Sequence, residues 1–481
     1  MNLTANKILI FLTSIFFLLA LLAIHQFNLN SDGAHYALYG QHLALSYYDH
    51  PPMVGWLEGI AIKIFGVNDF AAMTIPVLAS LLTILGIYQL TAYLYPQSKN
   101  WIALLAAVGL FNIIMLTPWV FDLLPQSLFI LFAGLSAWTL YRITQQDSWI
   151  NWLLLGLFVG SAGLSDYTVL PFVAGMLLFI LIYQRHCLLT VKPYVSVLLA
   201  LIIFSPVIIW NAEHHFVSFQ YQLHHGLNST FVFKHFITSL ALQMLYYNPA
   251  LVVLITMACI DGFRRGIKEK LCLCLSLPIL FLFFYSGGHA IVLPHWPATG
   301  YLLLLPMTAC YVFHHWHTRL IKIISLIALG FTLTLYIVGY TLIATHFLKR
   351  PINKDPLHDL YGWQQAANEA NIQLNKLDQQ THTTHELFVW NWHVAGRIAW
   401  YAQKPVQVAD IATHQFQFWY GKPNRQSDGV MVIFGDESKP AKKNTQPGMF
   451  AHCDFLKQLT TTVAGRPFNH FNYYHCSDFL I

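Results

Sequence analysis

The sequence predicts a mainly α-helical protein that crosses a membrane about eleven times and carries a small α/β domain at its C-terminal end. Of its 481 residues, 56% are hydrophobic and only 10% are charged, whereas about 25% are charged in ordinary soluble domains. Apolar runs close to the ~20 residues that span a bilayer recur along the first 345 positions. Backbone groups in such runs must be satisfied internally, which favours helices. After residue 346 no such run remains, and this stretch holds 13 of the 26 lysines and arginines. We therefore expect a transmembrane domain at 1–345 and a soluble domain at 346–481.

The predicted spans follow the apolar runs in order. They cover residues 8–25, 72–95, 101–116, 125–142, 150–163, 168–183, 192–209, 237–259, 271–286, 298–312 and 321–345. Two of them, 150–163 and 168–183, are short for a bilayer. These two are expected to tilt little or to form a broken pair around Asp166.

Positive charge in the loops predicts the orientation, because cytoplasmic loops carry the excess of lysine and arginine. With a cytoplasmic N-terminus, the outer loops before the tail contain only Lys63 and Lys234. The inner loops then contain Lys7, Lys99, Arg142, Arg185, Lys192, Arg264, Arg265, Lys268, Lys270, Arg319 and Lys322. The net charge of +5 is thus a topology signal and does not suggest a nucleic acid partner. An odd number of spans puts residues 346–481 outside, together with the loops 26–71 and 210–236.

Segment 8–25 has a second interpretation as a signal peptide, since Lys7 precedes its apolar core. No small-x-small cleavage site follows the core, so a retained anchor is favoured. Cleavage would leave the orientation of the later spans unchanged.

The tail alternates helical and strand patterns, which is typical of a small α/β domain. Helices are expected at 358–377 and 393–403. Strands are expected at 386–392, 406–409 and 430–435.

Cys453 and Cys476 are the only cysteines after residue 346. An outer domain lies in an oxidising compartment, so we predict a disulfide between them, with two buried free thiols as the alternative. The other five cysteines fall within spans or inner loops, where packing explains them.

Polar and aromatic residues gather in the predicted outer loops, where the informative residues of a membrane protein often lie. The first outer loop contains two segments with helical patterns, 36–45 and the amphipathic 53–65. Taken singly, each polar residue has a plain explanation as a solvated loop residue, and each aromatic as an interface anchor. Their common placement on one face makes them candidates for a site: Asp32, His35, Tyr47, Tyr48, Asp49, His50, Trp56, Asp166, Trp210, Asn211, His214, His295 and Trp296.

Four of these candidates have side chains that bind divalent cations. Asp32, His35, Asp49 and His50 could ligate such an ion, but their spacing matches no standard metal site. The expectation is therefore no required cofactor, or a divalent cation of unknown identity.

The order of these segments resembles the C-type glycosyltransferases that use polyprenyl-phosphate sugars. The chain is most similar to the bacterial branch of the protein O-mannosyltransferase superfamily, which includes the transferase that adds aminoarabinose to lipid A. The resemblance is carried by Asp32 after the first span and by the block Tyr47-Tyr48-Asp49-His50-Pro51-Pro52 with Trp56. It continues in Leu164-Ser165-Asp166-Tyr167-Thr168, in Pro206 through Phe219, in His295-Trp296-Pro297 with Gly300-Tyr301, and in Asp359-Leu360-Tyr361-Gly362-Trp363.

The resemblance implies an inverting sugar transfer by single displacement. Asp32 would act as the general base for an acceptor hydroxyl, and His50 would contact the donor phosphate, where charge develops. Tyr47, Tyr48 and Trp56 would pack on the sugar or the prenyl chain.

Three positions depart from the family pattern. Gly33 follows Asp32 where a glutamate is usual, Asp166 stands where a lysine is common, and Gln126, with Asp122 nearby, replaces a second outer acidic residue.

Two other function classes compete with the transferase. A degenerate relative would bind a lipid-linked sugar without turnover, and Gly33 motivates this alternative. A lipid or solute transporter would show inverted repeats and ionisable residues at mid-membrane, and the sequence shows neither. The expected partners are a polyprenyl-phosphate sugar, the lipid bilayer and an envelope glycolipid, glycan or protein acceptor. The expected location is the bacterial inner membrane, with the C-terminal domain in the periplasm.

Overall fold

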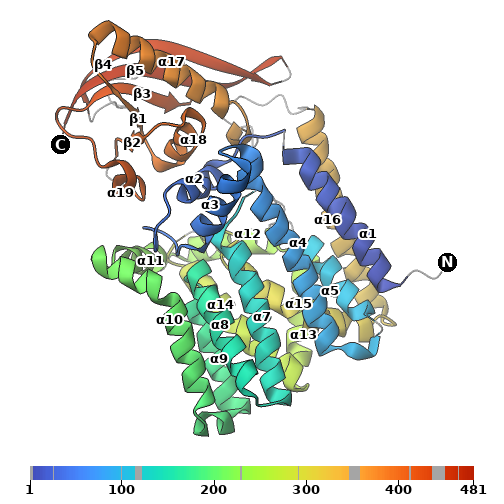
Figure 1. The fold of residues 1–481 in the computed structure, drawn as a ribbon. Helices are drawn as coiled ribbons and strands as arrows, with labels where there is room; N and C mark the ends of the chain where they lie inside the picture. Colours follow the sequence, from blue (N-terminus) through green and yellow to red (C-terminus); the bar gives the residue numbers. More distant parts are fainter. Residues whose placement is uncertain are drawn as a thin grey trace. The chain divides into compact units, whose positions relative to one another are not determined.

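A computed structural model of the chain describes residues 4–24, 26–98, 100–113, 122–227, 230–290, 292–345, 358–410, 413–435, 450–463 and 465–480. These residues form two compact units. The first comprises residues 1–22, 44–54 and 73–337, and the second comprises residues 23–43, 55–72 and 338–481. The second unit therefore includes most of the first outer loop, which the sequence-based division grouped with the transmembrane domain. Figure 1 shows the elements in chain order.

The first unit is a bundle of helices. Its members are α1 (Ala5–Ile24), α4 (Asp69–Leu94), α5 (Trp101–Phe111), α7 (Pro125–Gln145), α8 (Trp149–Ser165), α9 (Val169–Tyr183), α10 (Lys192–Glu213), α11 (Val217–Leu227), α12 (Phe233–Tyr246), α13 (Pro249–Gly262), α14 (Ile267–Ser286), α15 (Ala298–His314) and α16 (Arg319–Thr345). Short 3₁₀ turns lie at Pro96–Ser98 and Arg185–Leu189. Each of the eleven predicted spans coincides with one of these helices, except 237–259, which coincides with two.

A helix that is apolar on all sides is expected to be buried in the bundle. α15 is buried along nearly its whole length and packs against α14, α13, α5 and α7. α8 packs between α7 and α10, and Gly156 lets α8 approach α10 closely, because a Cβ there would lie 2.4 Å from the Ser196 carbonyl oxygen. By contrast, α10 and α16 leave large apolar side chains exposed, as lipid-facing helices do.

Length and composition identify five described helices that could cross a membrane, or six if α12 and α13 form one bent span. α5, α8, α9 and α15 are apolar but shorter. The described helices therefore do not confirm the predicted number of about eleven spans, although helices are present at the predicted positions.

The predicted span 237–259 is wrong as a single helix. α12 and α13 meet at an angle of 98°. Pro249 begins α13 and disfavours helical backbone at the preceding residue. That residue, Asn248, has a φ of 63° and caps α13 by accepting the backbone N–H of Ala250 and of Leu251.

The second unit contains α2 (Ser31–Gln41) and α3 (Met53–Phe65) from the first outer loop, together with the tail. The tail forms a 3₁₀ turn (His358–Leu360), α17 (Trp363–Thr381), β1 (Glu386–Val389), α18 (Trp392–Ala402), β2 (Val406–Val408), α19 (Phe416–Tyr420), β3 (Asp428–Phe434), β4 (Phe450–Val463) and β5 (Arg466–Phe479). The sheet order is β2-β1-β3-β5-β4. β2, β1 and β3 are parallel, and β5 runs antiparallel to both β3 and β4.

The two faces of this sheet are packed differently. On one face, the hydroxyl of Tyr473 donates to the Ala366 carbonyl of α17 and Phe471 contacts Trp363. On the other face lies an apolar cluster that includes Phe388, Met431, Phe450, Tyr474 and Phe479. Cys453 and Cys476 belong to this cluster and are cross-strand partners on β4 and β5, with their sulfurs bonded and their α-carbons 4.1 Å apart.

Candidate functional site

In the helical unit, the segment that contains Tyr47 through Pro52 is held by α11. The Ser218 hydroxyl donates to the Tyr47 carbonyl at 2.8 Å, and the Gln222 side-chain amide donates to the Asp49 carbonyl at 2.7 Å. The rings of Tyr48 and Tyr221 lie 4.8 Å apart. Because these bonds use main-chain oxygens of the segment, they fix its path.

The turn after α10 sets the direction of α11. Asn211 is fully buried, and its side-chain oxygen accepts the backbone N–H of Ser218. The backbone N–H of Phe216 donates to the Asn211 carbonyl at 2.6 Å. His215 and Phe216 have φ values of 56° and 59°, so this turn uses left-handed backbone at two residues that do not favour it.

Asp166 and Tyr167 occupy the turn between α8 and α9. Asp166 is 3% exposed, and one of its carboxylate oxygens accepts the backbone N–H of Thr168 at 2.6 Å. Burial raises the pKa of Asp166, while the charge of His50 lowers it. Burial also raises the pKa of Tyr167, against hydrogen bonds with Ser46 and Ser218.

His50 also interacts with His295. Burial lowers the pKa of His295 to about 3, and the proximity of His50 adds to this shift. His295 is therefore neutral at pH 7. His50, Asp166 and His295 thus form one electrostatic group, named here the His50 group.

The remaining candidates in this unit have mainly packing contacts. Trp210 stacks on His214 with ring centroids 4.0 Å apart, and His214 Nδ1 bonds the Trp210 carbonyl. Trp296 lies 6.0 Å from the ring of Phe283 and 6.4 Å from that of His295. These contacts are those of a helix end and an interface aromatic.

In the second unit, Asp32 lies in the first turn of α2. The Asn30 side chain caps this helix by accepting the Gly33 N–H at 2.8 Å, so the residue that replaces the family's glutamate takes part in the cap. α2 packs against α18 at Gly396, where a Cβ would lie 3.2 Å from the His35 nitrogen. Asp32 is half-buried.

Arg397 on α18 is a buried cation whose charge interacts with that of Asp32. Its guanidinium donates to Asp359 at 2.6 Å and lies 3.5 Å from the ring centroid of Trp363. Burial lowers the pKa of Arg397, and the charges of Asp359 and Asp32 oppose this shift. The Asp359–Trp363 block noted in the sequence therefore holds a buried arginine.

His35 and Trp56 complete the candidates of the second unit. His35 is 1% exposed and is surrounded by the rings of Tyr39, Trp392 and Phe416, at 5.1, 5.3 and 5.7 Å. Trp56 is half-buried on α3. These ring contacts of His35 are those of a core residue.

The thirteen predicted site residues are thus divided between the two units. Asp32, His35 and Trp56 belong to the second unit, and the other ten belong to the helical unit: Tyr47, Tyr48, Asp49, His50, Asp166, Trp210, Asn211, His214, His295 and Trp296.

Sequence reasoning missed two residues with side-chain hydrogen bonds in the second unit, Asp69 and Arg397. Asp69 accepts bonds from the Trp400 indole and the Tyr401 hydroxyl, both at 2.9 Å. In the sequence Asp69 has the appearance of an ordinary helix-start aspartate. Arg397 lies within a predicted helix and carried no local signal.

Comparisons with known proteins agree with the resemblance seen in the sequence. Residues 49–210 match the family described as dolichyl-phosphate-mannose-protein mannosyltransferase. The lipid A galacturonosyltransferase RgtD of Rhizobium johnstonii is 22% identical over 282 residues, which are 56% of this chain and 58% of that protein. The matched region is thus less than two thirds of that relative.

Two solved structures share the fold. ArnT from Cupriavidus metallidurans bound to undecaprenyl phosphate has a TM-score of 0.65 at 12% identity, over 96% of this chain and 97% of that chain. The oligosaccharyltransferase of Archaeoglobus fulgidus in complex with Zn and sulfate has a TM-score of 0.53 at 13% identity, over 85% of this chain and 64% of that chain. Together these matches confirm the fold class that the sequence predicted, and the family match over residues 49–210 agrees with the resemblance.

Proposed function

We propose that this chain is a C-type glycosyltransferase that transfers a sugar from a polyprenyl-phosphate donor to an envelope acceptor. Support comes from the fold shared with ArnT, a structure solved with undecaprenyl phosphate. Further support comes from the matched relative, which is named a lipid A galacturonosyltransferase. Lipid A or lipopolysaccharide is therefore the first acceptor to test, ahead of another glycan or a protein.

The observation that carries this proposal is the His50 group. His50 and Asp166 both lie within the stretch that matches the mannosyltransferase family, and their charges interact. A phosphate leaving group needs a cation or hydrogen-bond donors aimed at its developing charge. The imidazole of His50 offers a ring N–H that can donate to that charge.

The reaction proposed is a single displacement. The acceptor hydroxyl loses its proton to a carboxylate base, assigned to Asp32, as its oxygen bonds the anomeric carbon. The bond from that carbon to the phosphate oxygen breaks on the opposite side, so the configuration inverts. The polyprenyl phosphate leaves with the bonding electrons, and its charge is stabilised by His50.

The proposal includes a location and an orientation. The protein would lie in the bacterial inner membrane with its N-terminus in the cytoplasm and its C-terminal domain in the periplasm. The excess of basic residues in the loops assigned to the cytoplasm supports this orientation. The chemistry requires no cofactor, and a dependence on a divalent cation would appear as loss of transfer after chelation.

The test is transfer by the purified full-length chain in lipid nanodiscs. Polyprenyl phosphates carrying different radiolabelled sugars are supplied with lipid A, and both labelled product and released polyprenyl phosphate are measured. Equal amounts of product and released lipid are expected for the correct sugar.

Two outcomes contradict the proposal. Saturable binding of donor without release of polyprenyl phosphate favours the degenerate relative that Gly33 suggests. If the purified chain in liposomes instead moves an intact lipid or solute across the membrane without cleaving it, the protein is a transporter.

A further inference from the structure

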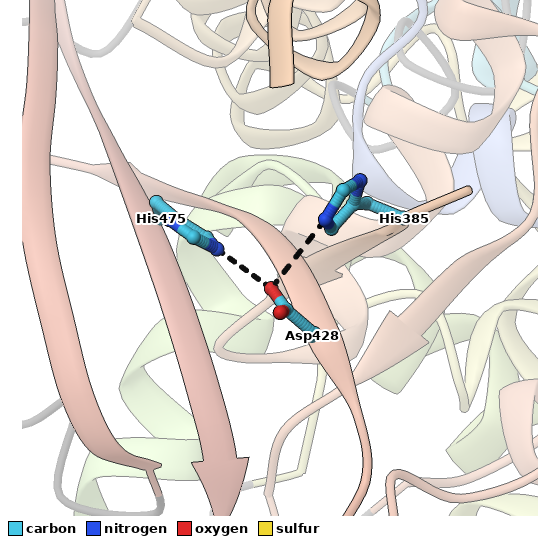
Figure 2. Close-up of side chains that lie close together, drawn as sticks. All are labelled: His385, Asp428 and His475. Carbon is cyan, nitrogen blue, oxygen red and sulfur yellow. Dashed lines mark hydrogen bonds and ion pairs between the residues drawn. The ribbon is translucent and has the colours of Figure 1, made fainter. Parts of the chain in front are cut away.

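Three ionisable side chains in the tail share one face of the sheet, outside the candidates discussed above. They are His385, which directly precedes β1, Asp428 at the start of β3, and His475 on β5 (Figure 2). Glu386 pairs with Gly429, so the residues just before them, His385 and Asp428, are also neighbours. His475 is the partner of Val430, two residues from Asp428 and therefore on the same face. The register of the strands therefore brings these three side chains close together.

The distances within the trio suit a single small cation. His475 Nε2 lies 2.7 Å from the Asp428 carboxylate, and His385 Nε2 lies 4.0 Å from the same oxygen. One ligand atom from each residue falls within 4.8 Å of the others. Zinc with bonds of 2.0–2.1 Å needs ligand atoms about 3.3 Å apart, so small side-chain adjustments would complete the site.

A second carboxylate orients His385. Asp378 at the end of α17 accepts both the backbone N–H of His385 at 2.9 Å and the ring Nδ1–H at 2.8 Å. With its proton on Nδ1, the neutral ring has an unshared electron pair on Nε2. That nitrogen faces the Asp428 oxygen across 4.0 Å, and a cation between the two could bind both. A carboxylate behind a ligating histidine is the usual outer partner of a metal site.

We propose that His385, Asp428 and His475 bind a zinc ion in the C-terminal domain. Two imidazoles and one carboxylate form the donor set typical of zinc with three protein ligands. The side chain of His385 is 3% exposed, whereas those of Asp428 and His475 are 42% and 29% exposed. The ion would thus be held from the α17 side and keep a fourth position open to solvent for water or an anionic oxygen.

The bound ion would link three neighbouring strands. His385 extends β1, Asp428 begins β3, and His475 lies in β5. Thr381 and Thr383 hydroxyls lie 3.4 Å from His385 Nε2 and would bond that nitrogen in the zinc-free protein. This site is independent of sugar transfer and can be tested without it.

The test measures zinc retained by the full-length chain in nanodiscs. After treatment with a chelator and reloading with zinc sulfate, the protein is desalted and its metal content determined, with affinity measured by competition against a chromophoric chelator. About one zinc per chain is expected for the unaltered protein. Asp428→Asn and His475→Gln should lose it, and Asp378→Asn should retain it with an affinity about 10–100-fold weaker.

His470→Gln is the matched control, because His470 lies five residues from His475 on the same strand and bonds Thr460 instead. It should bind zinc as the unaltered protein does. Cobalt loading of the unaltered protein provides a readout that needs no variant, since four-coordinate cobalt has intense visible absorption. Failure of the unaltered protein to retain zinc, or equal loss in the control, would overturn the proposal.

Discussion

Asp32 is a half-buried carboxylate whose charge interacts with the buried guanidinium of Arg397. Asp32→Asn keeps the size of the side chain and removes the base, so turnover should fall by about 10²- to 10⁴-fold. The measurement is initial rate at saturating donor and acceptor in nanodiscs.

Asp359→Asn provides the comparison for that variant, because it removes the direct ion partner of the same arginine. It should lower the midpoint of thermal unfolding more than Asp32→Asn does. Near-normal transfer by Asp32→Asn would assign the base elsewhere, first to Asp49 or Asp166.

His50 and Asp166 should act as a pair on donor binding. His50→Ala removes the proposed phosphate contact, so the donor Kd should rise more than the rate at saturating donor falls. Asp166→Asn should change donor Kd in the same direction, because it removes the carboxylate that interacts with His50. The effects of the two changes should be less than additive in the double variant.

Donor binding is measured directly, with a fluorescent polyprenyl phosphate. An unchanged donor Kd together with loss of the chemical step in His50→Ala would exclude the phosphate role. Full additivity would mean that Asp166 acts without His50.

At the level of elements, the strength of local patterns decided what could be predicted. The amphipathic stretch predicted at 53–65 is α3 itself, since its apolar spacing is helical. The hairpin of β4 and β5 was missed, because irregular register after Phe455 and Thr460 breaks the two-residue alternation that identifies strands. The trio of His385, Asp428 and His475 is spread over about ninety positions, so only the sheet register reveals it.

The disulfide between Cys453 and Cys476 belongs to the same hairpin. Its two cysteines are cross-strand partners with a sequence separation of 23, and closing such a loop contributes roughly 3 kcal/mol in the chain-entropy model. Protein isolated from cells, denatured without reductant and alkylated, should yield the two cysteine peptides linked. After reduction, the thermal midpoint should fall while the strands still pair.

Cys272 and Cys310 are internal controls in that experiment, since they lie in the helical unit and are free. They should be alkylated in the denatured protein without reductant. Alkylation of Cys453 and Cys476 under the same conditions would contradict the disulfide and the outer location of the tail together.

For the molecule as a whole, hydropathy predicted the membrane class, but the grouping of segments came only from the fold. Residues 23–43 and 55–72 belong to one compact unit with the tail, because α2 packs on α18 and Asn28 bonds Leu360 and Trp363. These contacts join residues more than three hundred positions apart. No local pattern in either segment indicates its partner.

The orientation of the whole chain in the membrane can be tested with reporter fusions. An alkaline phosphatase reporter fused after Ile481 should be active, since that enzyme needs an oxidising compartment. The same reporter after Gly266 should be inactive, and a fluorescent cytoplasmic reporter at the two positions should give the reverse. Activity after Gly266 would invert the orientation and move the outer-loop candidates to the cytoplasmic side.

The sheet order has a consequence for biosynthesis. β5 is the last strand in the sequence, yet it lies between β3 and β4. While the ribosome is still making residues 466–479, the parallel strands end in an unpaired β3, and β4 has no neighbour. Exposed strand edges of this kind attract other chains. Translation stalls or premature termination anywhere before Arg466 should therefore yield products that aggregate or are degraded, and quality-control proteases should be most important to this protein during the synthesis of its final strand.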